Sequence, residues 1–132
     1  MKNQPVVLIT LCMALLLFGC AGIQGQTQGK NTAAITLEGN PTTGYSWVYT
    51  LSTLSPQAVI REVSKEYIPN TSDKNIVGSG GKFVFTFEAI AAGEADIIFS
   101  YRRAWEENTA PVKTISYRAM ADNKNNLTLT LQ

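Results

Sequence analysis

After residue 30, hydrophobic and polar positions alternate with a period of two along most of the chain. Phe83, Phe85 and Phe87 alternate with smaller or polar residues, and the segments 35–37 and 97–101 repeat the pattern. This period is that of a β-strand with one buried face. It predicts strands near residues 35–37, 47–51, 59–68, 82–90, 95–101, 114–120 and 127–131, and no stretch after residue 30 keeps a helical period for three turns.

Short strands separated by turn signals are typical of an immunoglobulin-like β-sandwich, so we predict an all-β fold class with about seven to eight strands. We place this single domain at residues 33–132. The chain reverses at 91–94, so the strands on either side bring 78–81 and 102–105 to the same end of the sandwich. Strands that run up and down bring residues 40–44 there too. Loops held by such a scaffold are where binding sites are commonly built.

The N-terminal segment has the pattern of a signal peptide at residues 1–19. Lys2 precedes an apolar run at 6–18, which is short for a membrane span, and a polar segment follows it. The alternative is a buried core helix. The last residues before the predicted cut, 17–20, resemble a bacterial lipobox, which implies a lipid attached to Cys20. Because Ala21 is not acidic, we expect a lipidated tether at 20–32 and a place in the bacterial cell envelope at the outer membrane, on its periplasmic or surface face.

Composition excludes several chemistries. The chain has no histidine, so Ser-His-Asp sites, Cys-His sites and HExxH zinc sites are excluded. Neither cysteine remains for a disulfide once Cys12 is removed and Cys20 is acylated. The chain lacks nucleotide-binding glycine motifs and a basic stripe, so we expect no cofactor, no metal and no nucleic-acid partner. Ten acidic residues leave a glycosidase-like carboxylate pair formally possible.

The turn at 40–44 is more specified than a simple hairpin needs. Pro41 fixes φ, Gly44 permits a left-handed conformation, and the Asn40 side chain can cap the turn. These residues predict a stiff wedge tipped by Thr42 and Thr43, although a well-formed hairpin loop remains the simpler interpretation. Of the two aromatic residues that follow, we interpret Trp47 as core and leave Tyr45 open as a support beneath the wedge.

Two further segments are unusual. Residues 78–81, which read Gly78, Ser79, Gly80 and Gly81, leave bare backbone that suits a closely approaching partner, or they provide only flexibility. Arg103, Ala104 and Trp105 follow the strand at 95–101, and an exposed tryptophan there is typical of an interface anchor. The alternative is that Trp105 closes the bottom of the core. We interpret Glu106 and Glu107 as residues that keep this loop solvated.

Together the three segments resemble the chagasin family of cysteine-peptidase inhibitors, in which an Asn-Pro-Thr-Thr-Gly-aromatic turn, a Gly-x-Gly-Gly loop and an Arg-Pro-Trp loop occur in this order. The resemblance covers about residues 35–131. It implies a monomer that reversibly occludes a papain-like cysteine peptidase, endogenous or host. It further implies that Thr42 and Thr43 enter the cleft, 78–81 bonds through its backbone, and Trp105 stacks on an aromatic surface beside Arg103. Ala104 replaces the family proline, so we expect a less pre-ordered third loop.

Two rival functions remain at this point. A ligand- or carbohydrate-binding lipoprotein would present its aromatic residues as a flat platform on a sheet face. A small hydrolase would need two acids about 5–10 Å apart in a pocket. The residues give no reason to expect such a pair, and the unusual aromatic residue lies in a loop.

Overall fold

The computed structural model describes residues 31–71 and 78–132. Their elements, in chain order, are β1 (Thr32–Gly39), η1 (Pro41–Thr43), β2 (Tyr45–Thr53), β3 (Ile60–Pro69), β4 (Gly81–Ala89), β5 (Gly93–Arg103), β6 (Lys113–Ala121) and β7 (Leu127–Leu131). Every strand expected from the alternating pattern is present, and most are longer than predicted by a few residues. The predicted all-β class is therefore confirmed.

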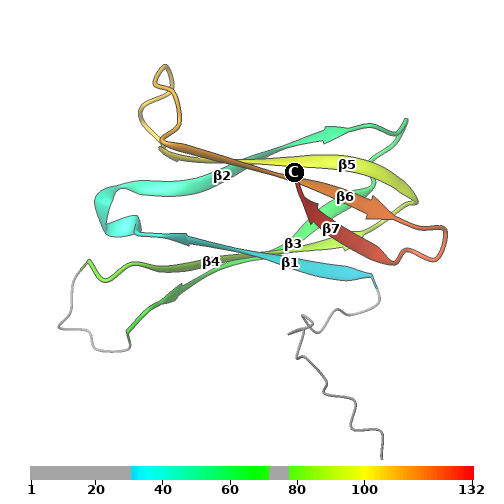
Figure 1. Cartoon of the computed structure of the whole chain (residues 1–132), viewed down its shortest axis with the longest axis horizontal. Helices are drawn as coiled ribbons and strands as arrows, with labels where there is room; N and C mark the ends of the chain where they lie inside the picture. The colour runs from blue at the N-terminus through cyan, green and yellow to red at the C-terminus, as the bar shows by residue number, and fades with distance from the viewer. Residues whose placement is uncertain (1–30, 72–77) are drawn as a thin grey trace, which may run out of the picture.

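The strands form two antiparallel sheets that face each other as the layers of a sandwich (Figure 1). One sheet has the order β1-β4-β3, and the other has the order β2-β5-β6-β7. The β1–β2, β2–β3 and β4–β5 connections therefore join strands of different sheets, while the β3–β4, β5–β6 and β6–β7 connections stay within one sheet. The chain crosses between the layers at its loops, as the predicted immunoglobulin-like sandwich requires.

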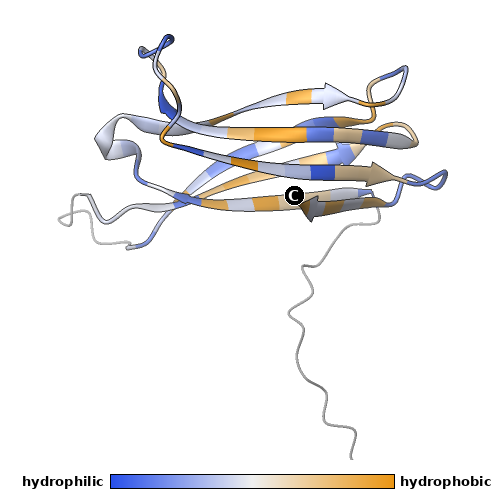
Figure 2. Cartoon of the chain, turned by 45° about the horizontal axis from the view of Figure 1, so that its top comes forward, coloured by the Kyte–Doolittle hydropathy of each residue, from blue (hydrophilic) through white to orange (hydrophobic). Residues whose placement is uncertain are grey.

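The core lies between the layers and consists of the inward positions of each alternating strand. Most of the apolar colour in Figure 2 follows the strands. Phe99 of β5 is at its centre, with the rings of Trp47, Phe85 and Tyr117 packed edge-on or tilted around it. Among the described residues, the buried hydrophobic ones are Ala33, Ile35, Leu37, Trp47, Val59, Ile60, Phe83, Phe85, Phe87, Ala89, Ala95, Ile97, Phe99, Ala119, Ala121 and Leu127.

Trp47 connects the two sheets beside the 40–44 turn. Its side chain is 1% exposed, which confirms the interpretation of Trp47 as core. Its Nε1 donates a hydrogen bond of 2.9 Å to the carbonyl oxygen of Glu38 in β1, and its own carbonyl accepts from Nζ of Lys65 in β3 at 3.1 Å. Since a buried indole N–H needs an acceptor, the bond from Trp47 to Glu38 holds the ends of β1 and β2 at a fixed separation.

Strand register brings three connections to one end of the sandwich. In the first sheet Gly81 is paired with both Gly39 and Pro69, so the β1–β2 and β3–β4 connections meet there. In the second sheet Tyr45 is paired with Arg103, which places the start of the β5–β6 connection at the same end. Figure 1 shows the η1 turn between the other two connections. The predicted gathering of the three segments is confirmed.

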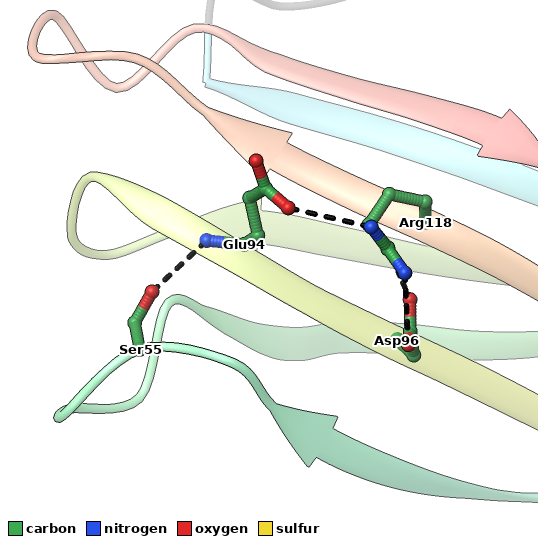
Figure 3. A network of polar contacts seen from close by, with 4 residues as sticks. All are labelled: Ser55, Glu94, Asp96 and Arg118. Carbon is green, nitrogen blue, oxygen red and sulfur yellow. Dashed lines mark hydrogen bonds and ion pairs between the residues drawn. The ribbon is translucent and has the colours of Figure 1, made fainter.

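The opposite end is closed by polar contacts (Figure 3). Ser55 Oγ, in the β2–β3 connection, accepts a hydrogen bond of 3.1 Å from the backbone N of Glu94. Arg118 of β6 forms a two-point ion pair with Asp96 and reaches Glu94 at 3.4 Å. The two carboxylates therefore share an arginine on the outer face of a sheet, which is the arrangement of a structural ion pair and not of a hydrolytic pocket.

The predictions for the N-terminal segment lie largely outside the described residues. The signal peptide at 1–19, Cys20 and most of the tether at 20–32 belong to this part of the chain. β1 begins at Thr32, and the carbonyl of Asn31 accepts a hydrogen bond of 2.8 Å from Ala89 N. Within residues 31–71 and 78–132, no helix has the length and apolar character needed to cross a membrane.

Candidate functional site

The turn at 40–44 is built as its sequence predicts. Asn40 is extended, Pro41 opens the single turn of 3-10 helix, and Gly44 ends it with a left-handed φ of 81°. The backbone N–H of Gly44 donates to the carbonyl of Pro41 at 3.0 Å. The Oδ1 of Asn40 accepts from the backbone N of Thr42 at 3.1 Å, as a capping asparagine does. The turn is thus held by hydrogen bonds of its own.

Both threonine hydroxyls at the tip are used inside the turn. Thr42 Oγ1 donates to Asn40 Oδ1 at 2.6 Å, and Thr43 Oγ1 donates to the carbonyl of Asn40 at 2.6 Å. Pro41, Thr42 and Thr43 are exposed. A partner that covers the tip therefore meets methyl groups and ring carbons, while the hydroxyl hydrogens stay engaged with Asn40.

The base of the turn rests on a tyrosine that the sequence reasoning assigned only to strand alternation. Tyr101 of β5 accepts a hydrogen bond of 2.8 Å from the backbone N of Asn40 through its hydroxyl. The ring of Tyr45 stacks on Tyr101 with centroids 5.4 Å apart. Tyr45 therefore supports the turn through Tyr101, which answers the question left open for it. No local sequence signal marks Tyr101, because its bond to Asn40 spans 61 positions.

The described part of the glycine segment is attached to the turn. Asn40 Nδ2 donates to the carbonyl of Gly78 at 2.9 Å, so one asparagine caps the turn and binds its neighbour. Gly78 and Gly80 have φ values of 84° and 70°, which other residues adopt at a cost. Ser79 is exposed, and its carbonyl accepts from Asn70 Nδ2 at 3.1 Å. Gly78 and Gly80 therefore allow the left-handed backbone conformations of this segment, and the Gly78 carbonyl binds it to the turn.

Gly81 departs from the prediction. It was expected to offer bare backbone to a partner, but it is buried as the first residue of β4. A Cβ at this position would lie 2.4 Å from the carbonyl oxygen of Ile68 and 2.7 Å from the ring of Tyr67. Glycine is therefore required there for packing between neighbouring strands. Gly81 still lines the hollow at this end of the sandwich, beside Gly78, Ser79 and Gly80.

Trp105 lies on the outside of the molecule and against the turn. Its side chain is 68% exposed, so it does not close the core, and the alternative interpretation is wrong. A Cβ built on Gly44 would lie 2.4 Å from Cη2 of Trp105, which shows how closely the indole covers this glycine. The guanidinium carbon of Arg103 lies 4.5 Å from the Tyr45 ring centroid and 5.9 Å from that of Trp105. These distances are within the range of cation–π contacts.

Glu106 also departs from the prediction, since it does more than solvate its loop. Its Oε1 forms an ion pair of 3.1 Å with Nη1 of Arg103, and its carbonyl accepts from Nη2 of Arg102 at 2.5 Å. Ala104 is exposed. These contacts hold the loop in which alanine replaces proline, and its lower pre-ordering relative to a proline loop stays a prediction.

We call these three neighbouring segments (residues 40–44, 78–80 and 103–106) the loop rim. Hydrogen bonds or van der Waals contacts join its central turn to each of the other two. Within residues 31–71 and 78–132, no cluster of three or more potential metal ligands occurs. The chemistry of the rim is that of a contact surface: exposed apolar groups, backbone polar groups and one exposed indole.

Fold and rim together define a class of protein, a small β-sandwich that presents three ordered, mutually contacting loops at one end. The chain belongs to the chagasin family: the family model "Chagasin family peptidase inhibitor I42" matches residues 26–119. It is 38% identical to Amoebiasin-1 of Entamoeba histolytica over 81 residues, 61% of this chain and 72% of that protein. It is 35% identical to Chagasin of Trypanosoma cruzi over 72 residues, 54% of this chain and 64% of Chagasin.

A solved structure supports the fold. The cysteine protease inhibitor EhICP2 of Entamoeba histolytica aligns with a TM-score of 0.55 and 22% identity, over 66% of this chain and 75% of that one. At this identity the likeness concerns the architecture alone. The family model and the curated relatives confirm the family resemblance found in the sequence motifs, and the solved structure supports the predicted sandwich architecture.

Proposed function

We propose that this protein is a reversible inhibitor of papain-like cysteine peptidases and that the loop rim is the surface that binds them. The observation that carries the proposal is the rim itself, in which a hydrogen-bonded wedge lies between a glycine segment and an exposed tryptophan. Membership in a family of peptidase inhibitors supports it. Because the rim is ordered before binding, little conformational entropy is lost on association.

In the proposed complex the η1 turn enters the active-site cleft. Thr42 and Thr43 lie at its exposed tip, so they are the residues placed nearest the peptidase nucleophile. The internal hydrogen bonds of the turn oppose the extended conformation that a substrate adopts, and this disfavours hydrolysis of its peptide bonds. The inhibitor therefore occludes the cleft and performs no chemistry itself.

The two other segments are proposed to grip the cleft on either side of the wedge. Gly78, Ser79 and Gly80 offer backbone polar groups to the peptidase. Trp105, exposed and flanked by Arg103 and Ala104, offers a large rigid apolar surface of the kind that dominates interface energies. A contact of about 1,600 Å² in total is the usual size for protease–inhibitor complexes.

The test is a titration of the purified protein into papain, with a fluorogenic peptide as the reporter substrate. We expect tight inhibition by the wild-type protein. Thr43→Trp should block entry of the wedge by bulk, and Gly44→Pro should prevent the left-handed end of the turn. Circular dichroism and thermal melting would establish that both variants remain folded.

Loss of inhibition in folded variants places the contact at the wedge. A wild-type protein that leaves papain and cathepsin L fully active at micromolar concentration contradicts the proposal. The exposed rim would then be assigned to a different kind of binding partner. A carbohydrate platform is disfavoured, because among the described residues Tyr49, Tyr101 and Tyr117 pack against the core. The exposed tyrosine on a strand, Tyr67, lies against Phe83 and forms no row of aromatic rings.

We also propose that the domain is attached to the bacterial outer membrane through a lipid on Cys20, which lies outside the described residues. The support is the lipobox-like sequence at 17–20 and the polar segment after it. Cys20→Ser should release the protein into the soluble fraction of cells. A variant that sediments with membranes as the wild type does would show that Cys20 is not the anchor.

A further inference from the structure

The loop that carries Trp105 closes as a β-turn. The backbone N–H of Glu106 donates to the carbonyl of Arg103 at 3.2 Å, so Ala104 and Trp105 occupy the two central positions. Neither central residue has a positive φ. In turns of this kind proline is favoured at the first central position because its ring presets φ there. Ala104 leaves that dihedral free, so the orientation of Trp105 must be fixed by other contacts.

Those contacts converge on Glu106. Its side chain forms an ion pair with Arg103, and its main-chain carbonyl is bound by Arg102. The side chains of Arg103 and Glu106 are 36% and 31% exposed, so the pair is partly shielded from solvent. Two successive residues of β5 are thus fastened to the residue directly after Trp105.

Arg103 connects this pair to the indole. Its guanidinium lies near the rings of both Tyr45 and Trp105. Its Nε is buried and has no hydrogen-bond partner, so few polar contacts besides Glu106 hold the group in place. If the carboxylate of Glu106 is removed, the guanidinium can turn toward water, and the indole loses one of the two surfaces against which it rests.

We propose that Glu106 is a positioning residue: acting through Arg103, it holds Trp105 against Gly44 in the orientation used for binding. It replaces by charge and hydrogen bonding the ordering that a proline at position 104 would supply by ring closure. The inference rests on the proposed function for its consequence in binding, although the placement of the indole can be measured without any peptidase.

The binding test compares dissociation rates from papain for the purified wild type, Glu106→Ala and Glu106→Gln. Glu107→Ala is the matched control, since Glu107 is the exposed neighbouring glutamate. We expect dissociation of Glu106→Ala to be faster by about tenfold, the cost of ordering one large side chain on binding. Glu106→Gln keeps an acceptor for Arg103, so its dissociation should be accelerated by a smaller factor. Glu107→Ala should dissociate at the wild-type rate.

Two further variants separate positioning from a general effect on the fold. In a Trp105→Ala background, Glu106→Ala should have no additional effect on dissociation, because the residue it positions is gone. Ala104→Pro should restore slow dissociation to Glu106→Ala. An effect of Glu106→Ala that persists without Trp105 would overturn the proposal.

Tryptophan fluorescence tests the same inference in the free protein. Trp47 is buried and Trp105 is exposed, so acrylamide quenches mainly Trp105, and Trp105→Ala identifies its share of the signal. Glu106→Ala should increase the quenching of Trp105, and Ala104→Pro should reverse the increase. Unchanged quenching overturns the role of Glu106, even if papain is inhibited. A wild type that fails to inhibit papain contradicts the proposed function alone, because the quenching result still decides the role of Glu106.

Discussion

The indole of Trp105 lies directly over Gly44, so closely that a Cβ on this glycine would come within 2.4 Å of Cη2. The two residues belong to different connections, and their contact joins the wedge to the third segment of the rim. Gly44 therefore has two functions: its φ of 81° ends the turn, and its missing side chain makes room for the tryptophan. Changes at either residue are expected to disturb the other.

Gly44→Ala should weaken inhibition of papain more than it weakens the fold. The left-handed conformation costs an alanine about 1–2 kcal/mol, and the new methyl group must displace the indole. Inhibition constants and urea denaturation measure the two effects separately. Gly78→Ala is the control: its φ is 84°, but of the residues that the structure describes, a Cβ there would meet only Thr42, whose Oγ1 lies 4.0 Å away. If both variants lose inhibition equally, the contact between Gly44 and Trp105 is not what matters.

Asn40→Asp should separate the two roles of Asn40. The carboxylate can still accept the hydrogen bonds from Thr42, so the wedge should persist, but it cannot donate to the carbonyl of Gly78. We expect little change in thermal stability and weaker inhibition. Asn40→Ala removes both functions and should cost about 1 kcal/mol in addition, as the loss of a helix cap does. An aspartate variant with wild-type inhibition would mean that the bond to Gly78 contributes nothing to binding.

Tyr101→Phe should loosen the wedge without altering the aromatic packing beneath it. The backbone N–H of Asn40 loses its acceptor, and a partly buried donor left unpaired costs about 1–3 kcal/mol. Chemical denaturation would report the loss, and peptidase titration would show weaker inhibition. Tyr117→Phe, a tyrosine that packs against the same core from β6, serves for comparison and should leave inhibition unchanged.

Acid should weaken the end of the molecule remote from the rim through Asp122. Hydrogen bonds from Asn126, from its side chain first and then its backbone, hold the pKa of the Asp122 carboxyl below its ordinary value. A lowered folded-state pKa stabilises the fold above the unfolded value of about 3.9, and this contribution is lost as pH falls through the folded value. Asp122→Asn should therefore lower the melting temperature at pH 7 and differ least from wild type in strong acid.

Inhibition by Asp122→Asn at neutral pH should equal that of the wild type, because Asp122 lies in the β6–β7 turn, at the other end of the sandwich. A melting difference that stays constant from neutral to strongly acid pH would show that the carboxylate charge is not involved.

Much of the fold could be predicted because the alternation of apolar and polar residues along a strand is visible in the sequence. The alternation at 83–87 and 97–101 predicts which side chains face inward, since side chains on a strand point to opposite faces in turn. The residues at 40–44 predict their turn because proline, glycine and a capping asparagine each act within a few bonds of their own backbone. Strand direction alone placed the three loops at one end.

The rest depended on contacts between residues far apart in the chain, which no local pattern contains. Sequence reasoning predicted the strands, the wedge and the exposed Trp105, while the tertiary structure decided how each of these is held. Gly81 is buried because two strands approach it, and Tyr101 supports Asn40 across 61 positions of sequence. Glu106 holds Arg103 only because the loop turns back on itself. Backbone preferences are short-range, because each residue type and its near neighbours set the local conformation. Register, burial and ion pairing arise only when the whole chain is packed.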